Sequence, residues 1–180
     1  MNFEEIVVGL KPLFESHGFK IIDKGESSVD FHSDKVSTRF AYDWRDKSIS
    51  FFVGKINGAQ CEINDENLKD VFNHKFDYNN NQSYLQNILD FLNGNGKALL
   101  MGDESKLTEL ENHVLNQAKI YTANLILSQN KALVDKAWTD KNYEQFLEYI
   151  NLIDPSQLPN SYLQKYKIAI KHLKNNPSNP

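Results

Sequence analysis

The sequence predicts an α+β protein in which an N-terminal helix packs on a four-stranded antiparallel meander and a helical half follows. Before about residue 60, apolar and polar residues alternate, which is typical of half-buried strands; beyond it, apolar residues recur at spacings of three and four, as in amphipathic helices. Short polar connections between the alternating stretches favour hairpins. We therefore expect a helix-plus-antiparallel-sheet domain at 1–63, a helical domain at 64–174 and a disordered tail at 175–180.

The first segment has the apolar spacing of an amphipathic helix. Glu4 and Glu5 lie in its first turn, where the helix dipole favours acidic side chains, and Gly18 can take the left-handed conformation that ends a helix. Pro12 removes an amide hydrogen bond inside the pattern, so we expect the helix to bend or divide there. One face carries the apolar residues Phe3, Ile6, Val7, Leu10, Leu13 and Phe14.

Four stretches of alternating residues follow, and we expect them to form the meander. They lie at about residues 19–22, 29–32, 36–43 and 48–53. Because successive side chains of a strand point to opposite faces, one face of this sheet is apolar and should pack on the first helix, while the other is polar. The sequence leaves open a further short strand at 60–63.

Beyond residue 64 we expect a series of amphipathic helices. Asn64 and Asp65 can cap the first of them, and Asp154-Pro155 and Leu158-Pro159 separate the last two. Residues 78–81 should form a loop. We interpret most of the helical stripes as core: Leu68, Val71 and Phe72; Tyr84, Leu85, Ile88, Leu89 and Leu92; Leu107, Leu110, Val114, Ala118, Tyr121 and Leu125, continuing to Leu133 and Trp138; Tyr143, Phe146, Leu147 and Ile150; and Tyr162, Tyr166, Ala169, Ile170 and Leu173.

Composition favours a cytoplasmic protein. The 180 residues carry a formal net charge of -4, and Cys61 is the only cysteine, so an intramolecular disulfide is excluded. The N-terminal residues are acidic where a secretory signal is basic, and no stretch approaches the roughly 20 apolar residues that span a bilayer. We expect no membrane partner.

No motif for a cofactor or a metal ion is found. The glycines at Asn93–Lys97 lack the spacing of a phosphate-binding loop, and no two of the five histidines have the i, i+4 spacing that places two metal ligands on one helical face. Lys165, Lys167, Lys171 and Lys174 make the last helix basic, but the chain has only two arginines and is acidic overall. Nucleic acid is therefore a disfavoured partner.

The polar face of the predicted sheet is the candidate site. Asp30 and His32 should share this face with Arg39, which could bind a carboxylate or phosphate in a bidentate fork. The alternatives are a solvated face with cross-strand ion pairs, or an enzyme in which His32 is the general base. Trp44 and Arg45 occupy the turn between the third and fourth strands, where Trp44 either belongs to a binding surface or folds back on the helix.

The last third of the chain combines aromatic, apolar and polar residues in a pattern typical of two packed helices: Ala137-Trp138, Asp140, Tyr143, Phe146, Leu147, Leu158-Pro159, Ser161, Lys165-Tyr166 and Ala169. In these residues it resembles a helical hairpin found in small uncharacterised bacterial proteins. It is also similar to one tetratricopeptide-type helix pair, although no second repeat is visible and about three are needed for a stable solenoid. The resemblance implies protein interaction and, by looser similarity of size and layout, a protein of the bacterial toxin-immunity type.

These observations together predict a non-enzymatic binding protein whose partner is another protein. A small enzyme using Asp30, His32 and Arg39 is the first alternative, and a nucleic-acid-binding regulator is the second. The sequence leaves the oligomeric state open.

Overall fold

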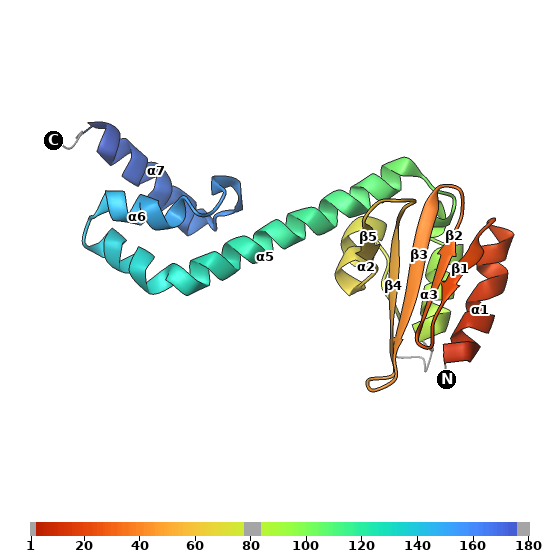
Figure 1. Ribbon diagram of the computed structural model, residues 1–180. Helices are drawn as coiled ribbons and strands as arrows, with labels where there is room; N and C mark the ends of the chain where they lie inside the picture. The colour runs from red at the N-terminus through yellow and green to blue at the C-terminus, as the bar shows by residue number, and fades with distance from the viewer. Residues whose placement is uncertain (1–2, 78–83, 176–180) are drawn as a thin grey trace. The chain divides into compact units, whose positions relative to one another are not determined.

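The computed structural model describes residues 3–77 and 84–175, and it confirms the predicted α+β class (Figure 1). The chain divides into two compact units, with the boundary between Val114 and Leu115. The elements are α1 (Phe3–Ser16), β1 (Lys20–Lys24), β2 (Ser28–His32), β3 (Val36–Asp43), β4 (Ser48–Lys55), β5 (Gln60–Glu62), α2 (Asp65–Phe72), α3 (Tyr84–Asn93), α4 (Lys97–Leu100), α5 (Glu104–Thr139), α6 (Tyr143–Ile150), the 3-10 turn η1 (Pro155–Gln157) and α7 (Asn160–Asn175).

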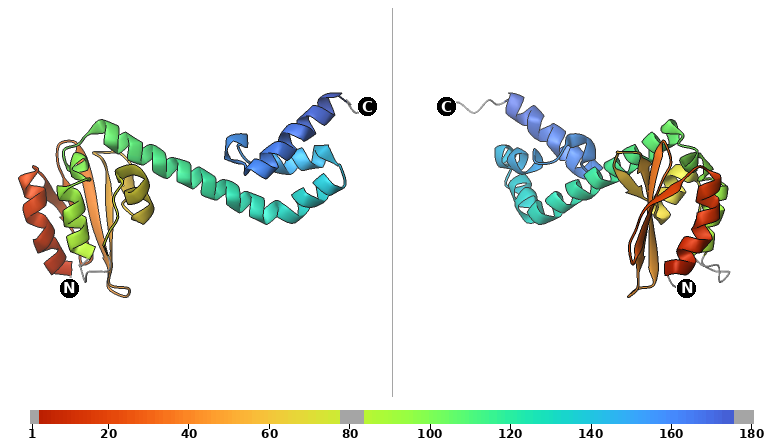
Figure 2. Two further views of the ribbon diagram at one scale, coloured as in Figure 1. Left: turned by 180° about the vertical axis from the view of Figure 1, so that it is seen from behind. Right: turned by 45° about the vertical axis from the view of Figure 1, so that its right-hand side comes forward.

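The sheet is an antiparallel meander in the order β1-β2-β3-β4-β5. It has five strands where the sequence predicts four, because the short stretch left open at 60–63 pairs with β4 through Phe52–Glu62, Val53–Cys61 and Gly54–Gln60. Helices α1 and α3 lie on the same face of this sheet (Figure 2). The opposite face, which we call the open face, carries no helix in the described part of the N-terminal unit. Arg39 on this face is exposed, whereas Ser37 is buried.

An aromatic cluster joins α1 to the sheet. The Phe40 ring stacks on the Phe51 ring at 4.5 Å between centroids, and the Phe14 ring of α1 packs edge-on against Phe40 at 5.5 Å. All three side chains are fully buried. Helix α1 runs without a break from Phe3 to Ser16, so Pro12 does not divide it. Pro12 lies on the exposed side of the helix, where water can reach the carbonyl group that loses its amide partner.

Helices α2, α3 and α4 belong to the core of the sheet unit, although the sequence assigns them to a separate helical domain. Leu68, Phe72, Ile88 and Phe91 form one continuous apolar cluster with the strands and α1. Helix α5 contributes Leu107 and Leu110 to the same cluster. The boundary therefore lies at 114/115 rather than at 63/64, because the amphipathic faces of these helices are buried against the sheet.

Strand β1 forms one edge of the sheet and is exposed along its whole length. Its register with β2 shifts between Ile21 and Asp23, which is the signature of a β-bulge. Lys20 and Lys24 stand at the two ends of the strand, and Lys24 forms an ion pair with Glu4 of α1 (2.8 Å). The edge strand is thus short, charged and bent.

The second unit, residues 115–180, contains the C-terminal part of α5 with α6, η1 and α7. Its core is small: Ala123, Leu127, Val134, Ala137, Phe146, Ile150, Ile153, Leu158 and Ala169. The prediction that the α5 stripe is core holds for Leu107, Leu110, Val114 and Trp138. The other residues of the stripe are exposed: Ala118, Tyr121, Leu125 and Leu133. The predicted tail falls almost wholly on residues 176–180, which lie outside the described residues, as does the whole of the predicted loop at 78–81.

Within the described residues, no helix has both the length and the apolar character needed to cross a membrane.

Candidate functional site

The open face of the sheet carries the predicted polar residues in a fixed register. Asp30 of β2 lies directly opposite Arg39 of β3, and His32 lies opposite Ser37. Across the next pair, Arg39 lies opposite Phe52 of β4. Directly opposite residues share a face, so Asp30, His32 and Arg39 lie on the same side of the sheet. This placement follows from the alternation in each strand and the antiparallel register.

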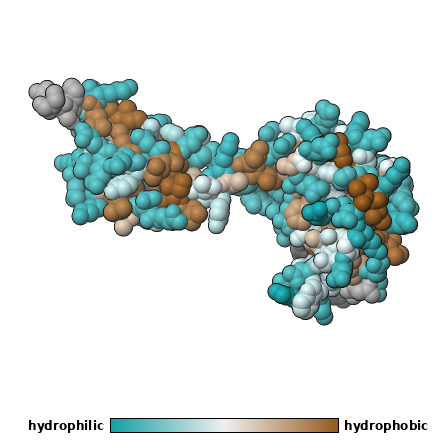
Figure 3. Space-filling model, viewed as in Figure 1, coloured by the Kyte–Doolittle hydropathy of each residue, from teal (hydrophilic) through white to brown (hydrophobic). Residues whose placement is uncertain are grey.

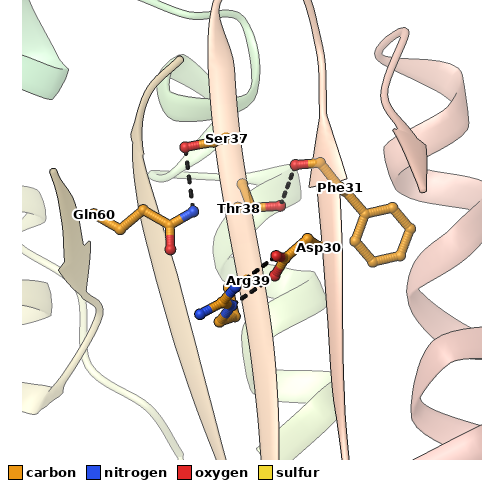
Figure 4. A network of polar contacts seen from close by, with 6 residues as sticks. All are labelled: Asp30, Phe31, Ser37, Thr38, Arg39 and Gln60. Atoms are coloured by element: carbon orange, nitrogen blue, oxygen red, sulfur yellow. Dashed lines mark hydrogen bonds and ion pairs between the residues drawn. The ribbon is translucent and has the colours of Figure 1, made fainter. Parts of the chain in front are cut away.

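Arg39 and Asp30 form a bidentate ion pair across the two strands (Figure 4). Nε and Nη2 of the guanidinium donate to Oδ1 and Oδ2 of the carboxylate, each at 2.7 Å. The hydrogen bonds and the charge of Asp30 raise the pKa of Arg39, and the nearby charge of Asp23 adds to this effect. Because Asp30 already binds the guanidinium group of Arg39, a ligand carboxylate or phosphate would have to compete with Asp30 for it.

Asp23 gives this ion pair a second role, since Asp23 lies directly opposite Asp30 on β1. Arg39 therefore offsets the repulsion between two facing carboxylates. A double-mutant cycle of Asp30→Ala and Arg39→Ala, followed by urea unfolding, should give a coupling energy of about 0.5–1 kcal/mol, near the upper end for exposed pairs because the geometry is bidentate. Strictly additive effects of the two changes would contradict a stabilising pair.

His32 is not joined to this ion pair. It lies two residues from Asp30 along the same strand, a separation of about 7 Å between backbone positions. Among the described residues, no hydrogen bond or ion pair connects His32 to Asp30 or Arg39. A general base needs a partner that orients it and a pocket that holds the substrate. The three residues of the enzyme hypothesis lie on the sheet surface without that arrangement.

The turn between β3 and β4 borders a depression of about 440 Å³ at one end of the open face. Trp44 is 69% exposed and does not fold back on a helix. The Arg45 guanidinium lies over the Trp44 ring, 5.2 Å from its centroid. The Asp43 carboxylate holds the turn by accepting hydrogen bonds from the backbone amides of Arg45 (2.7 Å) and Asp46 (3.4 Å). The depression is lined by Ser27, Ser28, Ala41, Tyr42, Asp43, Trp44, Arg45, Ser48 and Ser50.

The structure separates the five predicted site residues into two groups. Trp44 and Arg45 border the depression, whereas Asp30, His32 and Arg39 do not line it. Ser28, which lies opposite Ala41 and lines the depression, is not among the site residues predicted from the sequence. The alternation of β2 could have found it, because Ser28 is two residues before Asp30 and so points to the same side.

No family model, curated protein or solved structure matches this chain.

Proposed function

We propose that this protein is a non-enzymatic binding protein that recognises another protein through the β3–β4 turn and the adjoining depression. The main observation that supports this proposal is the exposure of the Trp44 side chain. A large aromatic side chain that is 69% exposed loses favourable contacts with the interior of its own unit, and such residues are enriched at the centres of protein interfaces. Arg45 extends the aromatic surface by stacking on it, which adds a second residue type that is enriched at such centres.

The open face supports binding rather than catalysis. Arg39 is engaged by Asp30, and His32 has no orienting carboxylate among the described residues. An open depression lined by serine and alanine side chains beside an aromatic residue suits the close approach of a partner backbone.

The charge of the sheet unit suggests the kind of partner. Residues 1–114 contain 12 Lys and Arg and 19 Asp and Glu, a formal net charge of −7, whereas the whole chain carries -4. The negative electrostatic field of this unit accelerates its association with a protein that has a basic surface. A basic partner is compatible with the toxin-immunity type suggested by the resemblance, and we include that type in the proposal.

Replacing Trp44 with alanine tests the proposal. Partners captured from native cells by the wild-type chain and identified by mass spectrometry should be lost or strongly depleted with Trp44→Ala. With a purified partner, Kd should rise by about 30-fold, the equivalent of roughly 2 kcal/mol for a central aromatic residue. The association rate should fall as the salt concentration rises, because salt screens the attraction of a basic partner.

Val8→Ala provides the matched control, since Val8 is 68% exposed in the same unit but lies on α1, outside the depression. It should leave the captured partner unchanged. Equal recovery of the same partner by wild type and Trp44→Ala would contradict the proposed binding surface.

A further inference from the structure

The two arginines of the chain differ in what their guanidinium groups contact. Arg39 is held by both carboxylate oxygens of Asp30, each at 2.7 Å. The Arg45 side chain is exposed and lines the depression, and its guanidinium forms no hydrogen bond or ion pair with any residue of the ranges 3–77 and 84–175. The arginine that is free to bind an added anion is therefore Arg45 and not Arg39.

Two contacts hold Arg45 in place before a partner arrives. Its backbone amide donates to Oδ1 of Asp43 (2.7 Å), and its guanidinium lies over the Trp44 ring, 5.2 Å from the centroid. A guanidinium carries its N–H donors at the edges of its plane, where a carboxylate can accept two of them side by side. Contact with the ring also limits the freedom of the side chain, so less entropy is lost when an anion binds.

The depression beside Arg45 offers further hydrogen-bond donors. Ser28, Ser48 and Ser50 line it, and within the described part of the chain their hydroxyl groups form no hydrogen bond. A hydroxyl group can donate to an anion or accept from a partner amide. In Figure 3 the end of the sheet unit that carries the β3–β4 turn is mainly teal and white, the colours of hydrophilic and intermediate residues. A polar group of the partner suits this surface better than an apolar one.

Asp43 is the acidic side chain that lines the same depression, so the alternative is a partner that inserts a cation there. Its Oδ1 atom already accepts hydrogen bonds from the backbone amides of Arg45 and Asp46, which close the turn. The Arg45 guanidinium has five donors and none of these contacts. The group at the depression that most lacks a partner is therefore the cation, which favours an anion as the occupant.

A contact with an anion is compatible with a partner whose surface is basic. The net negative charge of the sheet unit attracts such a surface from a distance of about a Debye length, whereas Arg45 acts within hydrogen-bonding distance. On a basic surface a carboxylate is the rarer group. Its contact with Arg45 therefore selects which part of that surface docks.

We propose that the partner protein presents the side-chain carboxylate of a glutamate or aspartate, which Arg45 binds through two parallel hydrogen bonds beside Trp44. The inference rests on the proposed function, because it names the group that is recognised at the same surface. It assigns to Arg45 the bidentate contact that the sequence suggested for Arg39.

An NMR titration with blocked amino acids tests which group is recognised. Because the chain has two arginines and two tryptophans, the side-chain Nε–H and indole N–H regions each contain two signals, which Arg45→Lys and Trp44→Ala assign. At about pH 6, where glutamate is ionised, N-acetyl-glutamate methylamide should shift the Arg45 and Trp44 signals in a saturable manner. The Arg39 signal should stay in place, because Asp30 engages that guanidinium. N-acetyl-glutamine methylamide, which has a similar shape without the charge, should shift neither signal.

Arg45→Lys keeps the positive charge but loses the planar pair of donors, so it should weaken binding of the glutamate probe by about tenfold. An unmoved Arg45 signal would overturn the inference, as would equal shifts with the glutamine probe or an equal shift of the Arg39 signal. Larger shifts of the Trp44 signal with N-acetyl-lysine methylamide would also overturn it, since they would identify Asp43 as the contact.

Partner capture separates a failure of this inference from a failure of the proposed function. Arg45→Gln should deplete the captured partner as Trp44→Ala does. A partner lost with Trp44→Ala but retained with Arg45→Gln would overturn the carboxylate contact and leave the binding surface standing. A partner retained by both variants would contradict the surface itself.

Discussion

Replacing Phe40 with alanine should lower the free energy of unfolding of the sheet unit by about 3–5 kcal/mol. Phe40 is fully buried, stacks on Phe51 and meets the Phe14 ring of α1 edge-on, so truncation removes both its own burial and the support of two neighbours. The contacts that would be lost join the sheet to the helix that covers it. Chemical denaturation followed by tryptophan fluorescence and circular dichroism measures the change.

Phe52→Ala is the matched control for this prediction. Phe52 is the same residue type on the neighbouring strand, but it lies on the open face opposite Arg39 and is only partly buried. Its truncation should lower stability much less than that of Phe40, since less surface returns to water. Equal losses for the two variants would mean that the open face is covered in solution, which would contradict its assignment as a binding surface.

Gly54→Ala should destabilise the same unit by about 1–3 kcal/mol or more, the range of overpacked sites, although it adds a single methyl group. A Cβ atom at this position would lie 2.2 Å from the backbone carbonyl oxygen of Ala59 and 3.0 Å from the Cα atom of Gln60. These atoms belong to the backbone of the β4–β5 hairpin, so no rotation of a side chain can make room. The strands must separate, which weakens the pairing of β5.

Gly25→Ala supplies the comparison, because a Cβ atom there would meet Ser28 Oγ at 3.5 Å, an ordinary contact. Its thermal unfolding temperature should stay close to that of the wild type, while that of Gly54→Ala should fall by several degrees. A Gly54→Ala variant as stable as Gly25→Ala would show that the hairpin does not approach β4 as closely as the structure indicates.

The strands of the sheet and its polar face could be predicted from the sequence because both follow from alternation. Phe40 and Phe51 occupy inward positions, and Asp30 and Arg39 occupy outward ones, whatever the partner strand. The pairing of Asp30 with Arg39 could not be predicted, because it depends on the register between β2 and β3, which alternation alone does not determine. The orientation of Trp44 could not be predicted, since a residue at a turn belongs to no periodic pattern.

The helical stripes show what the hydrophobic pattern leaves out. It identifies an apolar face but not the surface that covers it. The face containing Leu68 and Phe72 packs on the sheet, which moves the boundary from residue 63 to residue 114. Leu125 continues the same α5 stripe as Leu107, yet Leu107 is buried and Leu125 is 44% exposed. The same spacing of apolar residues therefore occurs both where a helix is buried in a core and where it is exposed to solvent.

The bulge in β1 has a consequence for how this protein avoids aggregation. A straight edge strand presents unpaired amide and carbonyl groups that can template the strand of another molecule, which is the first step towards cross-β fibres. The register shift at Ile21 and Asp23 interrupts that row of groups, and Lys20 and Lys24 would bring like charges together in many stacked arrangements. Growth of the sheet from molecule to molecule is thereby disfavoured, although Ile21 and Ile22 on this strand are both exposed.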